Sequence, residues 1–120
     1  MDKLKDLAKV IRSKNAGALL LTLDVMFEDQ AVYERVRNSN VLNVRAIAQL
    51  YGVSDNQIEI VPFDVAHAIK ITLPRAVPAG SPGDTDVYGA QQHAPLLEVQ
   101  VPLAYESANS ASVLKAAQRD

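Results

Sequence analysis

The spacing of apolar residues predicts three helices in the first half of the chain. Four of them recur at the intervals i, i+3, i+4 and i+7: Leu4, Leu7, Ala8 and Ile11. This spacing predicts a helix over residues 2–13. A second helix is predicted over 29–38, where acidic residues at its start suit the positive end of the helix dipole. A third is predicted over 43–51, because Asn43 can cap its first turn and Gly52 can adopt the left-handed conformation that ends it.

Alternation of apolar and polar residues predicts four strands, over residues 18–25, 57–61, 68–73 and 97–103. Pro102 cannot donate to a neighbouring strand, which favours an edge position for the last one. The helices and strands do not alternate regularly, so the predicted fold class is α+β, with three helices packed on a four-stranded mixed or antiparallel sheet. Nine apolar residues share the inward phase and form the predicted core: Leu7, Ile11, Leu21, Leu23, Ile47, Ile69, Ile71, Val99 and Val101.

Composition and charge narrow the class of protein. The chain has 120 residues, of which 48% are hydrophobic and 22% charged, as expected for one globular domain with its own core. We expect a single domain over 1–104 and a flexible tail over 105–120, where Ser, Ala and Asn dominate. The absence of cysteine excludes disulfides and thiolate chemistry. A net charge of −2 argues against binding to nucleic acid or to an anionic membrane.

The start of the chain indicates a compartment. Residues 1–6 mix both charge signs and lack the apolar run of a signal peptide. The longest apolar run, Ala18–Leu21, is far shorter than the ~20 residues that span a bilayer. We therefore expect a cytoplasmic protein.

A long segment between two predicted strands is the first candidate for chemistry. Residues 74–95 hold four of the six prolines and three of the five glycines. Connections beyond ~12–15 residues are usually functional or disordered. Both ends of this one attach to predicted strands, so we expect an ordered Gly/Pro-rich loop. It either forms a binding or interface site or is a surface excursion without a ligand.

This loop carries the candidate catalytic residues. His93 could act as a general base, with Asp84 or Asp86 orienting it, although a hydrogen-bonded structural histidine is an equal alternative. The Asp-x-Asp pair could also bind Mg²⁺ or Ca²⁺ through oxygens, whereas ordinary turn chemistry explains most such pairs. No resident metal site or other cofactor is assigned. Amide and hydroxyl groups that could bind a ligand lie in the same loop: Tyr88, Gln91 and Gln92.

A second candidate segment precedes the first predicted strand. It contains two cations, a hydroxyl and an amide in succession: Arg12, Ser13, Lys14 and Asn15. The cations could clamp a carboxylate or phosphate, or they could be ordinary partners of a helix C-terminus. Residues 1–14 carry five basic and two acidic residues, whereas 83–95 is acidic. We therefore expect the two segments to contact each other or a common ligand.

Three stretches together carry a resemblance to a known family. They are residues 12–17 (RSKNAG), 64–75, and 83–96 (GDTDVYGAQQHAPL). Over residues 3–103 the chain resembles a small bacterial domain family of unknown function, with Ala18 where the family tends to have proline and His67 where it tends to have asparagine. The family's members look like partners of, or fusions to, acyclic-terpene-utilisation type proteins. The resemblance implies a metabolic setting and a larger partner, and it transfers no catalytic residue.

These observations favour an accessory subunit or domain of a larger metabolic enzyme acting on an organic acid or acyl thioester. Residues 78–95 and Arg12–Asn15 would contribute to a site at the interface. We also expect an oligomer, because ordering a loop of this kind costs on the order of 1–2 kcal/mol per residue. Contacts with another chain would offset that cost by burying Val87, Tyr88 and Leu96. The alternative is a stand-alone small lyase or hydratase with His93 as the general base.

Overall fold

A computed structural model describes residues 1–75 and 92–103 of the chain. In order, its elements are β1 (Asp2–Lys3), α1 (Leu4–Leu7), β2 (Val10–Asn15), β3 (Leu20–Met26), α2 (Gln30–Ser39), α3 (Val44–Tyr51), the 3₁₀ turn η1 (Asp55–Gln57), β4 (Glu59–Phe63), the 3₁₀ turn η2 (Asp64–Ala66), β5 (Ala68–Pro74), α4 (Ala94–Leu97) and β6 (Gln100–Val101).

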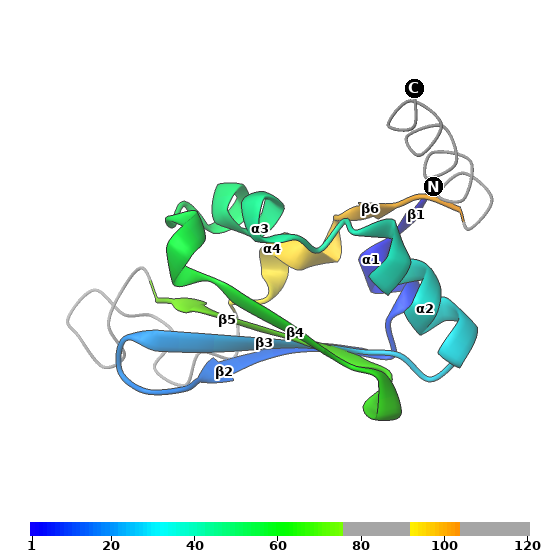
Figure 1. The fold of residues 1–120 in the computed structure, drawn as a ribbon, viewed down its shortest axis with the longest axis horizontal. Helices are drawn as coiled ribbons and strands as arrows, with labels where there is room; N and C mark the ends of the chain where they lie inside the picture. Colours follow the sequence, from blue (N-terminus) through cyan, green and yellow to red (C-terminus); the bar gives the residue numbers. More distant parts are fainter. Residues whose placement is uncertain (76–91, 104–120) are drawn as a thin grey trace, which may run out of the picture.

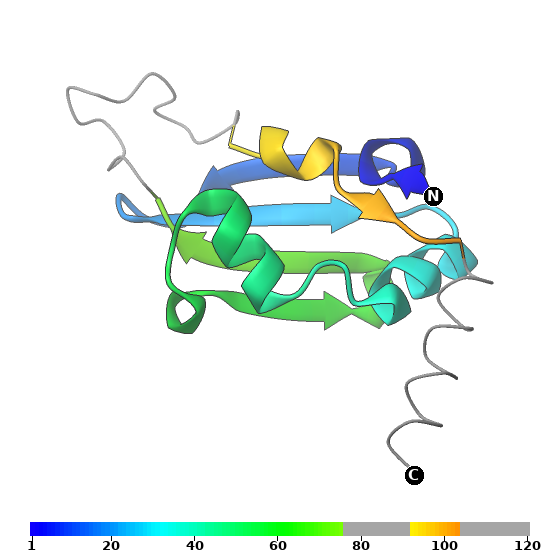
Figure 2. The same ribbon diagram turned by 90° about the horizontal axis from the view of Figure 1, so that it is seen from above.

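The main sheet has four antiparallel strands in the order β2-β3-β5-β4. The helices lie over one face of this sheet, and no described helix crosses the other face (Figures 1 and 2). The strands β1 and β6 pair with each other in a separate two-stranded ribbon on the helical side. The fold class is therefore α+β, as the sequence predicts, with an antiparallel main sheet.

The core lies between the sheet and the helices. Every second residue of the central strands β3 and β5 is buried against the helical layer, and Leu23 and Ile71 are directly opposite each other in the ladder. All nine predicted core residues belong to this cluster, with Leu7, Ile11 and Val99 partly buried at its margin. The alternation read from the sequence therefore identifies the buried face correctly.

Two helices, α2 and α3, begin and end within one residue of the predicted positions. At the start of α2 the Asp29 carboxylate accepts a hydrogen bond from the backbone N–H of Ala31 at 2.7 Å. At the start of α3 the Asn43 side chain accepts one from the N–H of Ala46 at 2.8 Å. The residue that follows α3, Gly52, has a φ of 67°, which glycine adopts without steric cost. The start of α2 and both ends of α3 therefore follow from residues close by in the sequence.

The helix predicted over residues 2–13 is wrong. Only Leu4–Leu7 is helical, and Val10–Asn15 forms β2, which pairs with β3 as a hairpin. The interval between Leu7 and Ile11 fits a helix, but the β-branched pair Val10 and Ile11 also favours a strand. Pairing with β3 satisfies the backbone groups of this segment at the edge of the sheet, and this decides the outcome.

The strand predicted over 97–103 is also largely wrong. The chain forms one helical turn, α4, and only Gln100–Val101 is extended, pairing with β1 outside the main sheet. Leu96 and Val101 are both fully buried. A continuous strand would point these two residues to opposite faces, because they are five positions apart. A helical turn followed by a short strand lets both enter the core.

The side chain of Arg35 on α2 fastens this two-stranded ribbon to the helical layer. Its guanidinium donates to the carbonyl oxygens of Pro102 at 2.8 Å and Val101 at 3.3 Å, and it contacts the Asp2 carboxylate at 2.8 Å. The arginine is mostly buried, so these groups replace the water that would otherwise solvate it. One side chain thus holds both ends of the described domain together.

Candidate functional site

The basic segment Arg12–Asn15 is divided between two faces of the sheet. Because successive residues of a strand point to opposite sides, Ser13 and Asn15 lie on the helical side, buried and half-buried, whereas Arg12 and Lys14 are exposed on the other face. The Arg12 Nε lies 3.3 Å from the Asp24 carboxylate on β3. The four groups therefore do not point to one side of the sheet. The alternative, in which the cations are partners of a helix C-terminus, is wrong because this segment is a strand.

The described ends of the long loop lie toward the same end of the sheet as the β2–β3 turn. The backbone N–H of Arg75 donates to the carbonyl oxygen of Leu19 at 2.9 Å, so the chain leaves the sheet beside the β2–β3 turn. Where it is described again, the carbonyl oxygen of Gln92 accepts a hydrogen bond from the Tyr51 hydroxyl at 2.8 Å. Tyr51 ends α3, which lies toward the same end of the sheet as the β2–β3 turn (Figure 2). Burial raises the pKa of Tyr51, which keeps this donor protonated.

His93 is the one predicted catalytic residue that the structure places. It is half-buried immediately before α4, and its carbonyl oxygen accepts a hydrogen bond from the N–H of Leu96 at 2.9 Å. The other loop residues proposed as catalytic or binding groups lie outside the described residues: Asp84, Asp86, Tyr88 and Gln91. Leu96, which we expected a partner to bury, is instead fully buried in the chain's own core.

A polar cluster that sequence reasoning missed joins α2 to η2. The buried Tyr33 donates its hydroxyl to the Asp64 carboxylate, and Arg37 Nη1 lies 2.9 Å from the same oxygen. The guanidinium carbon of Arg37 is also 5.4 Å from the centre of the Tyr33 ring, within the range of a cation–π contact. Tyr33 and Arg37 are four apart on α2, a spacing visible in the sequence, but nothing local indicates that Asp64 joins them.

These contacts shift the acidity of each group. Hydrogen bonds from Tyr33, and then from Arg37, hold the pKa of Asp64 below its usual value. Burial, and then the bond to Asp64, raise the pKa of Tyr33. The bond to Asp64 raises the pKa of Arg37. At neutral pH the cluster therefore consists of a carboxylate held by a neutral phenol and a cation.

His67 borders this cluster in a left-handed conformation. Its φ is 49°, and its ring centre is 5.8 Å from that of Tyr33. Its carbonyl oxygen accepts a hydrogen bond from the N–H of Phe27 at 2.9 Å, which ties η2 to the end of β3. Asparagine is the residue after glycine that best tolerates this backbone region, and histidine also occurs there. Histidine at this position is therefore compatible with the turn.

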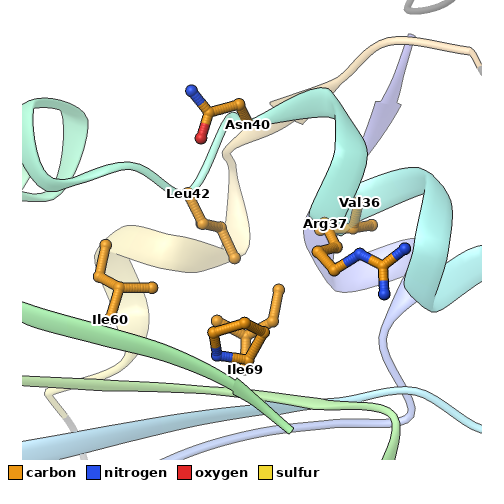
Figure 3. Close-up of a pocket in the computed structure, with 7 residues that line it drawn as sticks. Val36, Arg37, Asn40, Leu42, Ile60 and Ile69 are labelled. Carbon is orange, nitrogen blue, oxygen red and sulfur yellow. The ribbon is translucent and has the colours of Figure 1, made fainter. Parts of the chain in front are cut away.

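An apolar recess of about 170 Å³ lies between the end of α2 and the strands β4 and β5. Its walls come from both layers: Val36, Arg37, Asn40, Leu42, Ile60, Pro62 and Ile69. Figure 3 shows Leu42 and Ile69 directed into the recess, while the Arg37 guanidinium and the Asn40 amide turn away from it. The recess can hold a small apolar group, and no acid or base in its described lining faces inward.

Two kinds of feature are absent from the residues that the structure describes. Over 1–75 and 92–103, no three carboxylate or histidine side chains gather closely enough to hold a metal ion. Within the same ranges no helix has the length and apolar character needed to cross a bilayer.

The comparison with known families is decisive for identity. The family described as "Domain of unknown function (DUF4387)" matches residues 4–100. The chain belongs to this family. No curated protein and no solved structure shows a significant match to the chain.

Membership in DUF4387 confirms the expectation of a small domain of unknown function, and the matched residues 4–100 agree with the expected range of 3–103. The matched range runs from the first residue of α1 to the first residue of β6, so it takes in the helical layer and the whole main sheet. It also includes both candidate segments, Arg12–Asn15 and residues 78–95. The link to acyclic-terpene-utilisation type proteins stays a prediction.

Proposed function

We propose that this DUF4387 chain is an accessory subunit of a larger metabolic enzyme that acts on an organic acid or an acyl thioester. The β2–β3 turn and the loop that starts beside it would face that larger subunit. The observation that carries the proposal is the hydrogen bond of 2.9 Å between Arg75 and Leu19, because it brings the start of the loop to the hairpin that contains Asn15.

The tip of this hairpin supports an interface. Residues 16–20 contain no charged side chain, and Leu19 is 62% exposed. Single exposed leucines are common on monomers. Here, however, Leu19 lies within an uncharged turn flanked by the cation of Lys14, and an apolar centre with a polar rim is typical of protein interfaces. The ammonium group of Lys14 would then lie close to an acidic or thioester substrate bound between the subunits.

The recess beneath α2 favours an accessory role over a catalytic one. Five of its seven lining residues are apolar, and the one cation among them, Arg37, is already paired with Asp64. General acid–base catalysis needs a titratable group within hydrogen-bond reach of the substrate. The stand-alone lyase or hydratase therefore depends on His93 and on loop residues that lie outside the described ranges.

Co-expression of the full chain with the acyclic-terpene-utilisation type protein of its own organism tests the proposal. We expect the two to elute as one complex in gel filtration, and Leu19→Gln to weaken that complex at least several-fold. Leu50→Gln is the matched control, because Leu50 is 42% exposed on α3 and glutamine is also a good helix former. A wild-type chain that forms no complex, yet turns over a small acid by itself, would replace this proposal with the lyase or hydratase.

A further inference from the structure

We propose that the face of the main sheet that no described helix covers binds a second copy of this chain, in a dimer whose two-fold axis runs along the strands between β3 and β5. This face, called the outer face below, is the side of the sheet opposite the helices (Figure 1). The inference does not rest on the proposed function, although Lys14 borders both surfaces.

The register of the ladder arranges the outer face in rows that run across the strands from β2 to β4. Directly paired residues in antiparallel strands point to the same face. The rows are Val10, Met26, Ala68 and Phe63; then Arg12, Asp24, Lys70 and Val61; then Lys14, Thr22, Thr72 and Glu59; and last Leu20 and Pro74 on the two central strands.

Apolar side chains at both ends of the outer face are exposed to water. Phe63 is 48% exposed and Val10 is 36% exposed, at opposite ends of the first row. Leu20 in the last row is 43% exposed. These side chains belong to one continuous surface, because the ladder links every strand between them. An apolar row that crosses a whole sheet marks a surface that another protein covers.

The order of residues within each row indicates that the protein covering the outer face is a second copy of this chain. A half-turn about an axis along the strands places β2 of one copy over β4 of the other, and β3 over β5. Each row then faces itself in reverse order, as in any isologous interface. Val10 meets Phe63 of the second copy, while Thr22, which is only 4% exposed, lies opposite Thr72 and adds little contact area. Leu20 meets Pro74, so apolar side chains face apolar ones at both ends.

The charged positions also match under this symmetry. Lys14 faces Glu59 of the second copy, and Asp24 faces Lys70, each twice because of the two-fold axis. Arg12, which already pairs with Asp24 in its own copy, faces Val61. No like charges meet. A half-turn about the perpendicular in-plane axis would instead place Val10 against Lys14 and Phe63 against Glu59, which buries charge against apolar groups.

Lys14 and Glu59 cannot satisfy each other within one copy. They lie on the two edge strands, three strand spacings or about 14 Å apart. Among the described residues neither forms an ion pair. Their long side chains also tolerate the rotation of about 30° that the twist of packed sheets introduces. Lys14 and Glu59 can therefore form an ion pair only between two copies of the chain.

The area of the outer face limits the expected affinity of the dimer. Four strands of five to seven residues cover on the order of 400 Å² in plan, below the ~800 Å² per partner of a standard interface. We expect a dimer that forms at micromolar concentration and dissociates on dilution. Because the axis runs along the strands, both β2–β3 turns would point the same way.

Sedimentation equilibrium of the full chain, with charge-reversal variants, tests the dimer. Lys14→Glu alone and Glu59→Lys alone should each raise the dissociation constant by about tenfold or more, because attraction becomes repulsion at two places. Mixing the two single variants should restore association, since the new glutamate of one then faces the new lysine of the other. Arg45→Glu, on the exposed side of α3, is the control and should leave association unchanged.

A covalent test uses the absence of cysteine in the chain. In the double variant Val10→Cys with Phe63→Cys, the two thiols lie on opposite edges of one sheet and can bond only between copies. We expect a disulfide-linked dimer under mild oxidation. A wild-type chain that stays monomeric at its highest soluble concentration would overturn the inference. So would single charge variants that associate as well as the wild type, or that fail to associate when mixed.

Discussion

The hydroxyl of Tyr33 donates its hydrogen bond to the carboxylate of Asp64, which lies 31 residues further along the chain. This bond joins the middle of α2 to the turn that connects β4 and β5, and Arg37 completes it from the next turn of the same helix. A buried phenol needs such a partner, because an unsatisfied hydroxyl away from water is destabilising.

Removing this hydroxyl tests the importance of the contact. Tyr33→Phe keeps the ring, which packs against Phe27 with ring centres 6.0 Å apart, and deletes only the hydrogen bond. We expect the free energy of unfolding to fall by about 1 kcal/mol, the usual net value of one hydrogen bond. Urea denaturation monitored by circular dichroism measures the change. An unchanged urea midpoint would show that the hydrogen bond between Tyr33 and Asp64 adds no net stability.

The stability of the domain should depend on the charge of Asp64. Its pKa is lowered in the folded state, so its contribution is fully present above the unfolded-state value of about 3.9 and is lost as pH falls through the lower folded value. We expect Asp64→Asn to be less stable than the wild type near pH 7 and the difference to shrink below about pH 4. Urea unfolding across this pH range provides the measurement.

The same linkage acts with the opposite sign on Tyr33. Its pKa is raised in the folded state, so its contribution is present below the unfolded-state value of about 10 and is lost as pH rises through the higher folded value. Tyr33→Phe should therefore lose less stability than the wild type above about pH 10. Equal alkaline losses in the two proteins would contradict this assignment.

The centre of the sheet should be the most sensitive part of the core. Ile71 is fully buried on β5, which is paired on both sides. Ile71→Ala should lower the free energy of unfolding by roughly 2–5 kcal/mol, through lost burial and the cavity it leaves. Val65→Ala is the control, because Val65 is fully exposed in η2 and should change stability by less than about 0.5 kcal/mol.

Arg35 should control the local opening of the two-stranded ribbon. Arg35→Met keeps most of the aliphatic contact but leaves the carbonyl oxygens of Val101 and Pro102 without this donor. We expect a loss of roughly 1–3 kcal/mol and faster hydrogen exchange at the amide of Leu4, which donates to the Val99 carbonyl at 2.8 Å. Arg45→Met on α3 should alter neither quantity. Unchanged exchange at Leu4 in Arg35→Met would show that the ribbon is held by its own pairing.

Parts of this fold are determined by residues close together in the sequence. The caps of α2 and α3 bond within two or three residues, so Asp29 and Asn43 could be identified without any knowledge of the rest of the chain. The alternation of β5 is equally local, because a strand with one buried face must place an apolar residue at every second position. These elements, and the core they supply, are what the sequence by itself determined.

The tertiary structure decided the rest, because the partners of those segments are distant in the chain. The spacing of Leu7 and Ile11 suits a helix as well as a strand, and only pairing with β3 selects the strand. Leu96 and Val101 enter the same core only after α4 turns the chain. The pairing of Tyr33 with Asp64, and the rows of the outer face that align Lys14 with Glu59, exist only once the register is set. Periodicity records which way a side chain points, whereas the identity of its neighbour depends on how the whole sheet assembles.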